Sequence, residues 1–227
     1  LTTVGGYLSI RENLSLPTLD GLNAVLSIGG SLSISDNDAL TSLLGLSNVT
    51  SLGTSLTISD NDLLTNLDGL TGITTVLENV SIRSNSVLSC LSGLGNVTSV
   101  GGSLTIEENP LLGDLDDLTA LTAVVDHLSI TDNDALTSVS GLRNVASSVR
   151  WLLIEENDLL TTLEGLGGIT SVTYDMRVFD NASLSTLEGL AGLTSVGRDL
   201  RISNNPLLTD LGGLTPLALT TVGDDLS

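Results

Sequence analysis

The chain has 227 residues, a formal net charge of −20 at pH 7 and no lysine. So acidic a surface disfavours nucleic acids and anionic membranes as partners, because phosphate groups are bound by Arg and Lys. The single cysteine, Cys90, excludes a disulfide within the chain. No apolar run approaches the roughly 20 residues of a membrane-spanning helix, so we expect no direct insertion into a membrane.

One asparagine recurs every 24 residues along the whole chain. A constant period of this length predicts a solenoid, in which one supersecondary unit stacks on copies of itself. We therefore expect residues 1–227 to form a single domain of nine coils. Because the sequence starts and ends within a repeat, we also expect it to be part of a longer surface protein. The recurring residues are Asn13, Asn37, Asn61, Asn85, Asn109, Asn133, Asn157, Asn181 and Asn205.

Each repeat begins with a predicted β-strand. Apolar residues stand five and three residues before the asparagine, as Leu32 and Ile34 do before Asn37, and polar residues alternate with them. This alternation is typical of a short strand with one buried side. Nine such strands in register predict a parallel β-sheet along one face of the solenoid, with the polar residues pointing outward.

The second part of each repeat carries apolar residues at intervals of three, for example Leu40, Leu43 and Leu46. A glycine stands before the third of them in nearly every copy, as Gly45 does here. This spacing favours tight turns or 3₁₀ segments over α-helices. The predicted fold class is therefore a mainly β repeat solenoid with a parallel sheet on one face and turns on the others.

Three departures from the repeat carry predictions of their own. Asp117 replaces the recurring glycine. Ser148 stands where an apolar residue is expected, so Val149 is predicted to take that buried place. Two extra residues are predicted within 215–219, because the following apolar positions arrive two places late.

The recurring asparagine is expected to point inward and to have a structural role. The corner of a parallel coil leaves backbone groups unpaired, and an asparagine side chain supplies both donors and acceptors. Stacked asparagines can also bond to one another, so we predict a ladder along the solenoid axis. Direct ligand binding is the alternative role for these residues.

The run from Leu56 to Val76 reads LTISDNDLLTNLDGLTGITTV. Its Leu-x-Ile-x-x-Asn-x-x-Leu pattern resembles leucine-rich repeats, and the fuller pattern is similar to repeats of receptor L domains and related microbial surface proteins. The resemblance extends over all nine copies. It implies an extracellular or cell-surface module that recognises or adheres to a protein or glycan through its strand face.

Aromatic residues and arginines at outward positions gather in the later repeats. Three of the four aromatic residues and five of the seven arginines lie between residues 143 and 201. Exposed Trp, Tyr and Arg are typical of binding hot spots, so we predict one exposed binding patch there. Local pairing of the arginines with nearby carboxylates is the alternative. The candidate ligand-binding residues are Trp151, Tyr174, Arg177, Phe179, Arg201, His127, Arg150 and Arg198.

Acidic residues flank the asparagine in several repeats, as Asp36 and Asp38 flank Asn37. Stacked carboxylates could bind a divalent cation weakly, but no calcium-loop motif is present, and we favour a solvated acidic rim. We therefore predict no metal site and no cofactor.

Recurring Thr-Ser pairs such as Thr50-Ser51 and Thr98-Ser99 suggest an alternative function, because regular hydroxyl arrays on a flat face suit ice binding. A purely structural surface stalk is a second alternative. The sequence contains no nucleophile–base set, metal-ligand cluster or phosphate loop, so we expect no enzyme. An outward carboxylate pair such as Glu107 and Glu155 has a spacing that hydrolases can use, but solvated charge is the favoured explanation.

Overall fold

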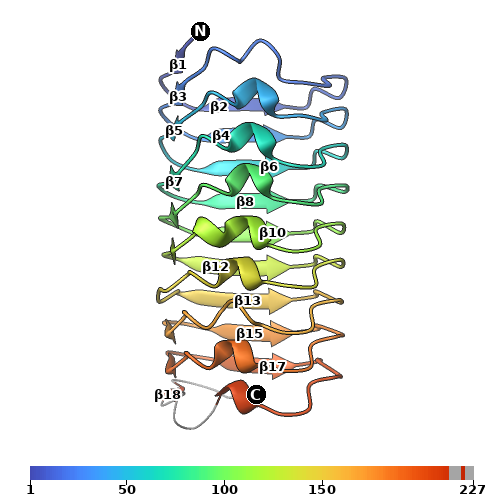
Figure 1. Cartoon of the computed structure of the whole chain (residues 1–227), viewed down its shortest axis with the longest axis vertical. Coiled ribbons are helices and arrows are strands. Elements are labelled where there is room, and N and C mark those ends of the chain that lie inside the picture. The colour runs from blue at the N-terminus through green and yellow to red at the C-terminus, as the bar shows by residue number, and fades with distance from the viewer. Residues whose placement is uncertain (215–220, 223–227) are drawn as a thin grey trace.

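The computed structural model is a parallel β-solenoid of about eight turns (Figure 1). It describes residues 1–214 and the short strand at 221–222. One nine-stranded parallel sheet runs the length of the solenoid, and its strands follow one another in chain order. They are β2 (Leu8–Arg11), β4 (Leu32–Ser35), β6 (Leu56–Ser59), β8 (Val80–Arg83), β10 (Leu104–Glu107), β12 (His127–Thr131), β13 (Trp151–Glu155), β15 (Met176–Phe179) and β17 (Leu200–Ser203).

The register of this sheet follows the sequence period. Leu32 pairs with Leu56, and Ile34 pairs with Ile58, so equivalent side chains stack directly on one another. The inward residues of these strands are completely buried through most of the stack. They are Leu, Ile or Val, except for Met176. No aromatic side chain belongs to this core in the described part of the chain. The predicted in-register parallel sheet is thus confirmed.

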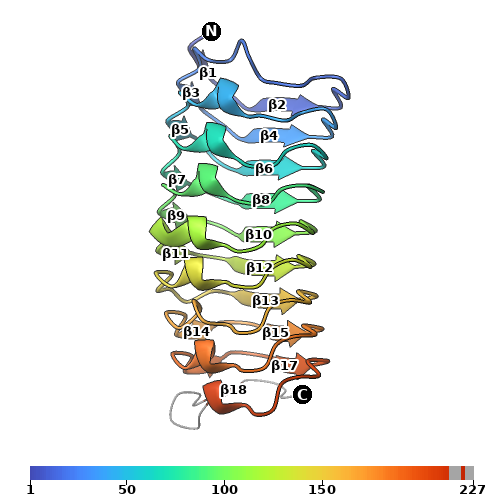
Figure 2. The same cartoon turned by 45° about the vertical axis from the view of Figure 1, so that its right-hand side comes forward.

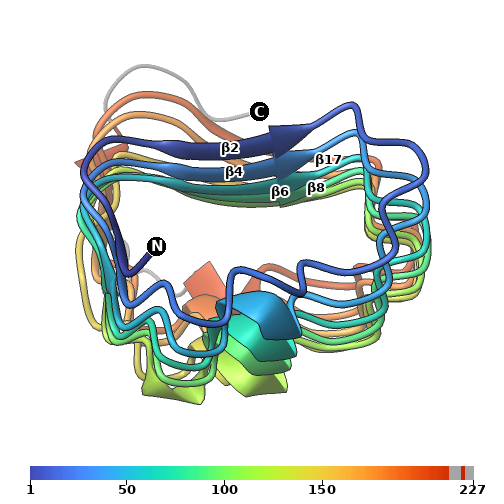
Figure 3. The same cartoon turned by 90° about the horizontal axis from the view of Figure 1, so that it is seen from above.

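A second, narrow side is formed by two-residue strands grouped into three parallel sheets. Viewed from above, this side leads the chain into the start of the long sheet (Figure 3). They are β1 (Thr3–Val4), β3 (Ser27–Ile28), β5 (Ser51–Leu52), β7 (Thr75–Val76), β9 (Ser99–Val100), β11 (Ala123–Val124), β14 (Ser171–Val172), β16 (Ser195–Val196) and β18 (Thr221–Val222).

The side opposite the long sheet carries short 3₁₀ helices, as the three-residue spacing predicted (Figure 3). Figure 2 shows them stacked one below another, each in its own turn of the solenoid. They are η1 (Leu44–Leu46), η2 (Asp68–Leu70), η3 (Ser92–Leu94), η4 (Asp116–Ala120), η5 (Ser140–Leu142), η6 (Glu188–Leu190) and η7 (Gly212–Leu214).

The recurring asparagines form the predicted ladder just beyond the long sheet. Asn61 is typical: its Nδ2 donates to the carbonyl oxygens of Ser59 and Ile34 at 2.8 and 3.1 Å, and to Asn85 Oδ1 at 3.3 Å. The seven asparagines from Asn37 to Asn181 are fully buried, whereas Asn13 is exposed and Asn205 is half-buried because each lies in an outermost coil. The ladder satisfies backbone groups that the corner would otherwise leave unpaired.

The residue before each asparagine adopts a left-handed backbone conformation. All nine such residues have φ between 52° and 59°, and none is a glycine. Asp and Asn tolerate this region better than other residues, which suits Asp36, Asp60, Asp132 and Asp180. Their side chains consequently point away from the core and form the acidic rim.

The recurring glycine has a steric explanation. A Cβ atom built on Gly93 would lie 1.5 Å from the carbonyl oxygen of Leu67 in the preceding coil. Most glycines of this column make equally close approaches. In the fifth repeat the 3₁₀ segment is longer and contains a kink at Leu118. There the carboxylate of Asp117 instead accepts a hydrogen bond from the Leu91 N–H at 2.9 Å.

The other two departures also have structural counterparts. Val149 is 1% exposed and forms a bridge with Val172, while Ser148 is exposed, so Val149 takes the buried place as predicted. The two-residue insertion predicted within 215–219 lies outside the described residues. Its effect is nevertheless visible, because Ser195 pairs with Thr221, two residues beyond the regular 24-residue step.

Candidate functional site

On the outer side of the long sheet, the side chains at equivalent positions change in size and charge from repeat to repeat. In the first repeats its side chains are small hydroxyls such as Ser33 and Thr57, which lie directly opposite one another in adjacent strands. In the later strands the equivalent positions hold Leu153, Arg177 and Arg201. The same scaffold therefore presents different surfaces at different positions along the solenoid axis.

Three aromatic rings and one arginine gather where β12, β13 and β15 begin. The ring centroids of His127 and Trp151 are 4.1 Å apart and their planes are inclined by 49°. Trp151 and Tyr174 lie 4.5 Å apart with planes inclined by only 9°. The Arg150 guanidinium carbon is 5.8 Å from the centre of the Tyr174 ring. We refer to His127, Arg150, Trp151 and Tyr174 as the aromatic cluster.

Asp126 lies close to two members of the aromatic cluster. Its Oδ1 lies 3.5 Å from Arg150 Nη1 and 3.6 Å from His127 Nε2. The three rings are half-buried and Arg150 is exposed. Because Trp151 and Tyr174 stack and His127 packs against Trp151 at an angle, part of each ring is covered by a neighbour, while the exposed Arg150 adds a positive charge. Such a ridge suits insertion into a partner better than it suits a flat sugar ring lying on one open aromatic face.

Of the other four predicted residues, three lie apart from this cluster. Arg198 lies beside it: its backbone N–H donates to the Tyr174 carbonyl oxygen at 3.1 Å, and its Nε lies 3.9 Å from Asp175 Oδ1, as the pairing alternative predicted. Arg177 and Arg201 occupy the middle of the sheet and are adjacent in register. Phe179 lies at the far end of β15, in register with Glu155, four residues or about 13 Å along the strand from Trp151. The predicted patch therefore consists of two groups along the strands.

Glu155 lies next to Phe179 at the far end of the strands and has an altered acidity. Partial burial raises its pKa, the nearby Arg177 lowers it, and the carboxylates of Glu156 and Asp180 raise it further. Glu107 and Glu155 line one shallow depression of about 300 Å³, with Thr131 between them in register. This is the carboxylate pair that the sequence suggested.

The acidic rim shows mutual repulsion. Burial raises the pKa of Asp132, and the carboxylates of Asp134, Glu108 and Asp158 raise it further. Within residues 1–214, no group of three or more His, Cys, Asp or Glu side chains is placed to hold a metal ion. The rim therefore provides a negative field without a defined cation site.

The Thr-Ser array lies beside the narrow sheets. Its hydroxyls are largely used within the solenoid: Thr98 and Thr122 donate to the carbonyl oxygens of Thr74 and Thr98, both at 3.0 Å. Thr50 donates to the Leu26 carbonyl oxygen at 3.3 Å in the same manner. These bonds tie each coil to the preceding one and leave mainly acceptor lone pairs for water.

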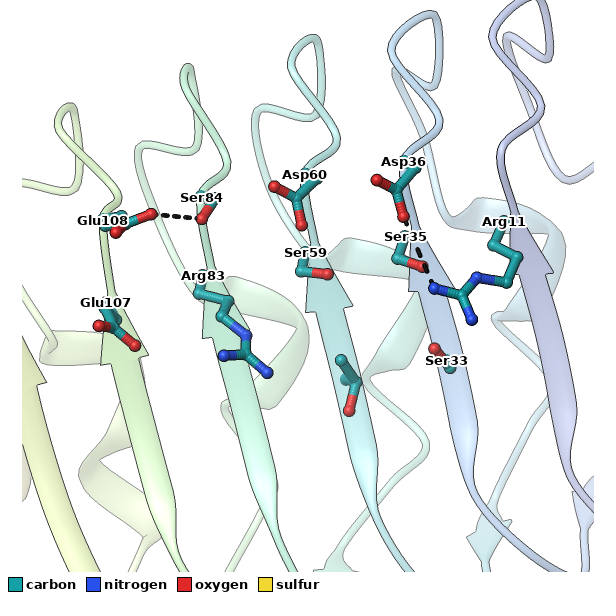
Figure 4. Close-up of a pocket in the computed structure, with 11 residues that line it drawn as sticks. Arg11, Ser33, Ser35, Asp36, Ser59, Asp60, Arg83, Ser84, Glu107 and Glu108 are labelled. Carbon is teal, nitrogen blue, oxygen red and sulfur yellow. Dashed lines mark hydrogen bonds and ion pairs between the residues drawn. The ribbon is translucent and has the colours of Figure 1, made fainter.

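Sequence reasoning missed a groove on the outer side of β2 to β8 (Figure 4). It has a volume of about 390 Å³ and a floor of Ser33, Ser35, Thr57 and Ser59. We refer to it as the serine groove. The sequence carried one sign of this groove: two arginines occupy the same outward position three strands apart, with serines at that position in the two strands between them. Its remaining lining residues are Arg11, Asp36, Asp60, Arg83, Ser84, Glu107 and Glu108.

Comparison with models of known protein families finds no match, and comparison with curated proteins finds no significantly similar sequence. No helix in the described part of the chain is long and apolar enough to cross a membrane.

Proposed function

We propose that this chain is a non-enzymatic recognition or adhesion module that binds a protein or glycan outside the cell through the outer side of its long sheet. The aromatic cluster is the observation that carries the proposal. It brings the only Trp of the chain together with Tyr174, His127 and Arg150 on an outward surface. Trp, Tyr and Arg are the residues on which binding energy most often depends.

The scaffold supports this role because it holds the cluster rigidly. Trp151 follows Arg150 into a strand that is paired on both sides, and each ring is fixed by its neighbour or by Asp126. A partner would therefore bind side chains that have already lost much of their conformational freedom. Solenoids of this type also offer long continuous surfaces that suit large partners.

The sequence resemblance supports an extracellular setting. Leucine-rich and receptor-L-like repeats share the Leu-x-Ile-x-x-Asn-x-x-Leu pattern seen from Leu56 to Leu64, and we propose that this chain is related to them. Membership of that group would place the module at a microbial cell surface or in secreted material. The partner would then be a surface protein or glycan.

The test is capture of partners from protein and glycan arrays by the folded chain, followed by affinity measurements on variants. The double variant Trp151→Ala and Arg177→Ala should weaken capture at least about tenfold, because it removes hot-spot contacts from both groups. Tyr7→Ala is the matched control: Tyr7 occupies the same outward column as Trp151 but lies at the other end and is 75% exposed.

If the double variant captured partners as well as the unmodified chain and kept an unchanged circular dichroism spectrum, the proposed binding surface would be wrong. If the unmodified chain captured nothing, a structural stalk would remain as its function. Thermal hysteresis measured on the same preparation tests ice binding separately.

A further inference from the structure

In the serine groove two arginines flank a floor of small hydroxyl side chains, and beyond Arg83 the lining continues to Glu107 and Glu108. Arg11, Ser35, Ser59 and Arg83 occupy equivalent positions in four adjacent strands, β2 to β8. With about 4.8 Å between neighbouring strands, the Cα atoms of the two arginines are about 14 Å apart. The side chains between them are short, so the outer surface is hollowed there (Figure 4).

Both arginines have donors to spare. Arg83 is exposed and forms no ion pair with any residue that the structure describes. Arg11 makes only loose, exposed pairs, at 3.8 Å to Glu12 and 3.9 Å to Asp36. Pairs of this kind contribute little to stability, so both guanidinium groups can turn toward a ligand at small cost.

Ser35 provides an independent sign that the groove is a site. The residue is only 4% exposed, lines the groove, and its Oγ makes no hydrogen bond within the described chain. A buried hydroxyl without a partner destabilises the fold, because it has lost its hydrogen bonds to water. Arg11 reaches across to Asp36, the residue after Ser35, so movement of the Arg11 side chain would open Ser35 to a ligand (Figure 4).

The chemistry of the lining selects a ligand class. Arginine and serine donors alternate with the acceptors Asp36, Asp60 and Glu107, and no aromatic or large apolar side chain lines the groove. Its four carboxylates outnumber its two arginines, so a polyanion would be repelled. A ligand is needed that both donates and accepts at many points and carries no charge. Neutral carbohydrate has that character, and the volume lies within the range of small-ligand sites.

We infer that the serine groove binds a stretch of a neutral carbohydrate chain, with Arg11 and Arg83 on either side of the hydroxyl floor and the Ser35 hydroxyl bonded to the sugar. The inference rests on the proposed function in that both place recognition on the outer side of the long sheet. It depends on different residues, however, because the aromatic cluster begins at β12, five strands beyond Arg11 and two strands beyond Arg83.

The experiment is calorimetric titration of the whole chain with neutral cello-, manno-, xylo- and N-acetylchito-oligosaccharides, and with oligogalacturonate and a heparin oligosaccharide as anionic probes. At least one neutral probe should bind. Arg83→Ser, which copies the residue present at this position in β4 and β6, should lower its affinity about tenfold or more by removing charged hydrogen-bond donors. Arg143→Ser, which removes an exposed arginine from the opposite side, is the matched control and should change nothing.

Ser35→Ala separates a binding role from a structural one. Removal of an unpaired buried hydroxyl should raise the melting temperature. The same substitution should weaken the neutral oligosaccharide severalfold if the hydroxyl bonds to the sugar. A rise in melting temperature with unchanged affinity would overturn the role of Ser35.

The inference fails if no neutral probe binds, if the anionic probes bind more tightly, or if Arg83→Ser binds as well as the unmodified chain. Its failure is distinguishable from failure of the proposed function. Partner capture lost with the Trp151 double variant but not with Arg83→Ser leaves the proposed function standing alone. The reverse pattern supports the groove and removes the aromatic cluster.

Discussion

Trp151 stacks on Tyr174 although the two residues are 23 positions apart, one fewer than the repeat. The same diagonal step joins Ser31 to Thr54, whose hydroxyl oxygens lie 2.7 Å apart, and Ser55 to Glu78 at 3.1 Å. Side chains at the start of one strand therefore meet the residue just before the next strand. In the first repeats this contact is a hydrogen bond, and in the later ones it becomes an aromatic stack.

The stack should contribute measurably to stability. In a double-mutant cycle of Trp151→Ala and Tyr174→Ala, urea unfolding should give a coupling free energy of about 0.5–1.5 kcal/mol, as expected for an aromatic pair. Trp151→Ala combined with Tyr7→Ala should be additive, since Tyr7 lies at the other end of the solenoid. A coupling indistinguishable from zero would mean that the rings do not stack in solution.

The asparagine ladder predicts a strong dependence on position. Asn109→Leu should lower the free energy of unfolding by about 1–3 kcal/mol, because it removes the donor to the Ile82 and Glu107 carbonyl oxygens and the acceptor for Asn85. Asn13→Leu should cost clearly less, because Asn13 is exposed. Equal losses for the two variants in chemical denaturation would show that burial in the ladder does not determine the effect.

The glycine column predicts a steric effect. Gly93→Ala should destabilise the chain by about 1–3 kcal/mol, because its Cβ would meet the Leu67 carbonyl oxygen and the coils would have to separate. Gly113→Ala is the control, since a Cβ there meets nothing within 4 Å. Melting temperatures of the two variants compare them directly. A Gly93→Ala protein as stable as the Gly113→Ala protein would contradict this close packing.

The raised pKa values of Asp132 and Glu155 predict that acidification stabilises the fold. Asp132 and Glu155 have ordinary pKa values of 3.8 and 4.5. At a pH above these values, the folded chain binds more protons at the two groups than the unfolded chain does. Their contribution is therefore most favourable below those values and is lost as the pH rises through the higher folded pKa values. The melting temperature should rise as the pH falls from 7 toward 4.5.

Asp132→Asn should flatten this pH dependence and raise the melting temperature at pH 7, because it removes one of the repelling carboxylates. Added salt should have a similar effect on the unmodified chain by screening the rim. A melting temperature that fell steadily on acidification over this range would contradict the assignment of repulsion to these groups.

The sequence period was sufficient to predict the sheet, its register and the ladder, because residues 24 positions apart must occupy equivalent places in a solenoid. The burial of Val149 at the place expected for residue 148 could also be predicted, since only one neighbouring apolar side chain was available for it. The recurrence of glycine was predicted as a turn signal, but its reason, contact with a carbonyl of the preceding coil, depends on the distance between coils. That distance is not encoded in the pattern of one repeat.

The candidate sites were only partly predictable. Column positions indicated that His127 and Trp151 would be neighbours. They also placed Phe179 on the outer side, but four residues further along the strand than Trp151, about 13 Å away, so the single predicted patch divides in two. The serine groove was missed because its significance depends on side-chain reach and burial. A serine in the sequence gives no sign that its hydroxyl, like that of Ser35, is buried without a partner.

Oxidative footprinting of the chain, free and bound to a captured partner, is the most direct test of recognition through the outer side of the long sheet. We predict that the partner protects Trp151 and Tyr174 from oxidation and leaves Tyr7 as reactive as in the free chain. Unchanged labelling of Trp151 and Tyr174 in the saturated complex would contradict the account.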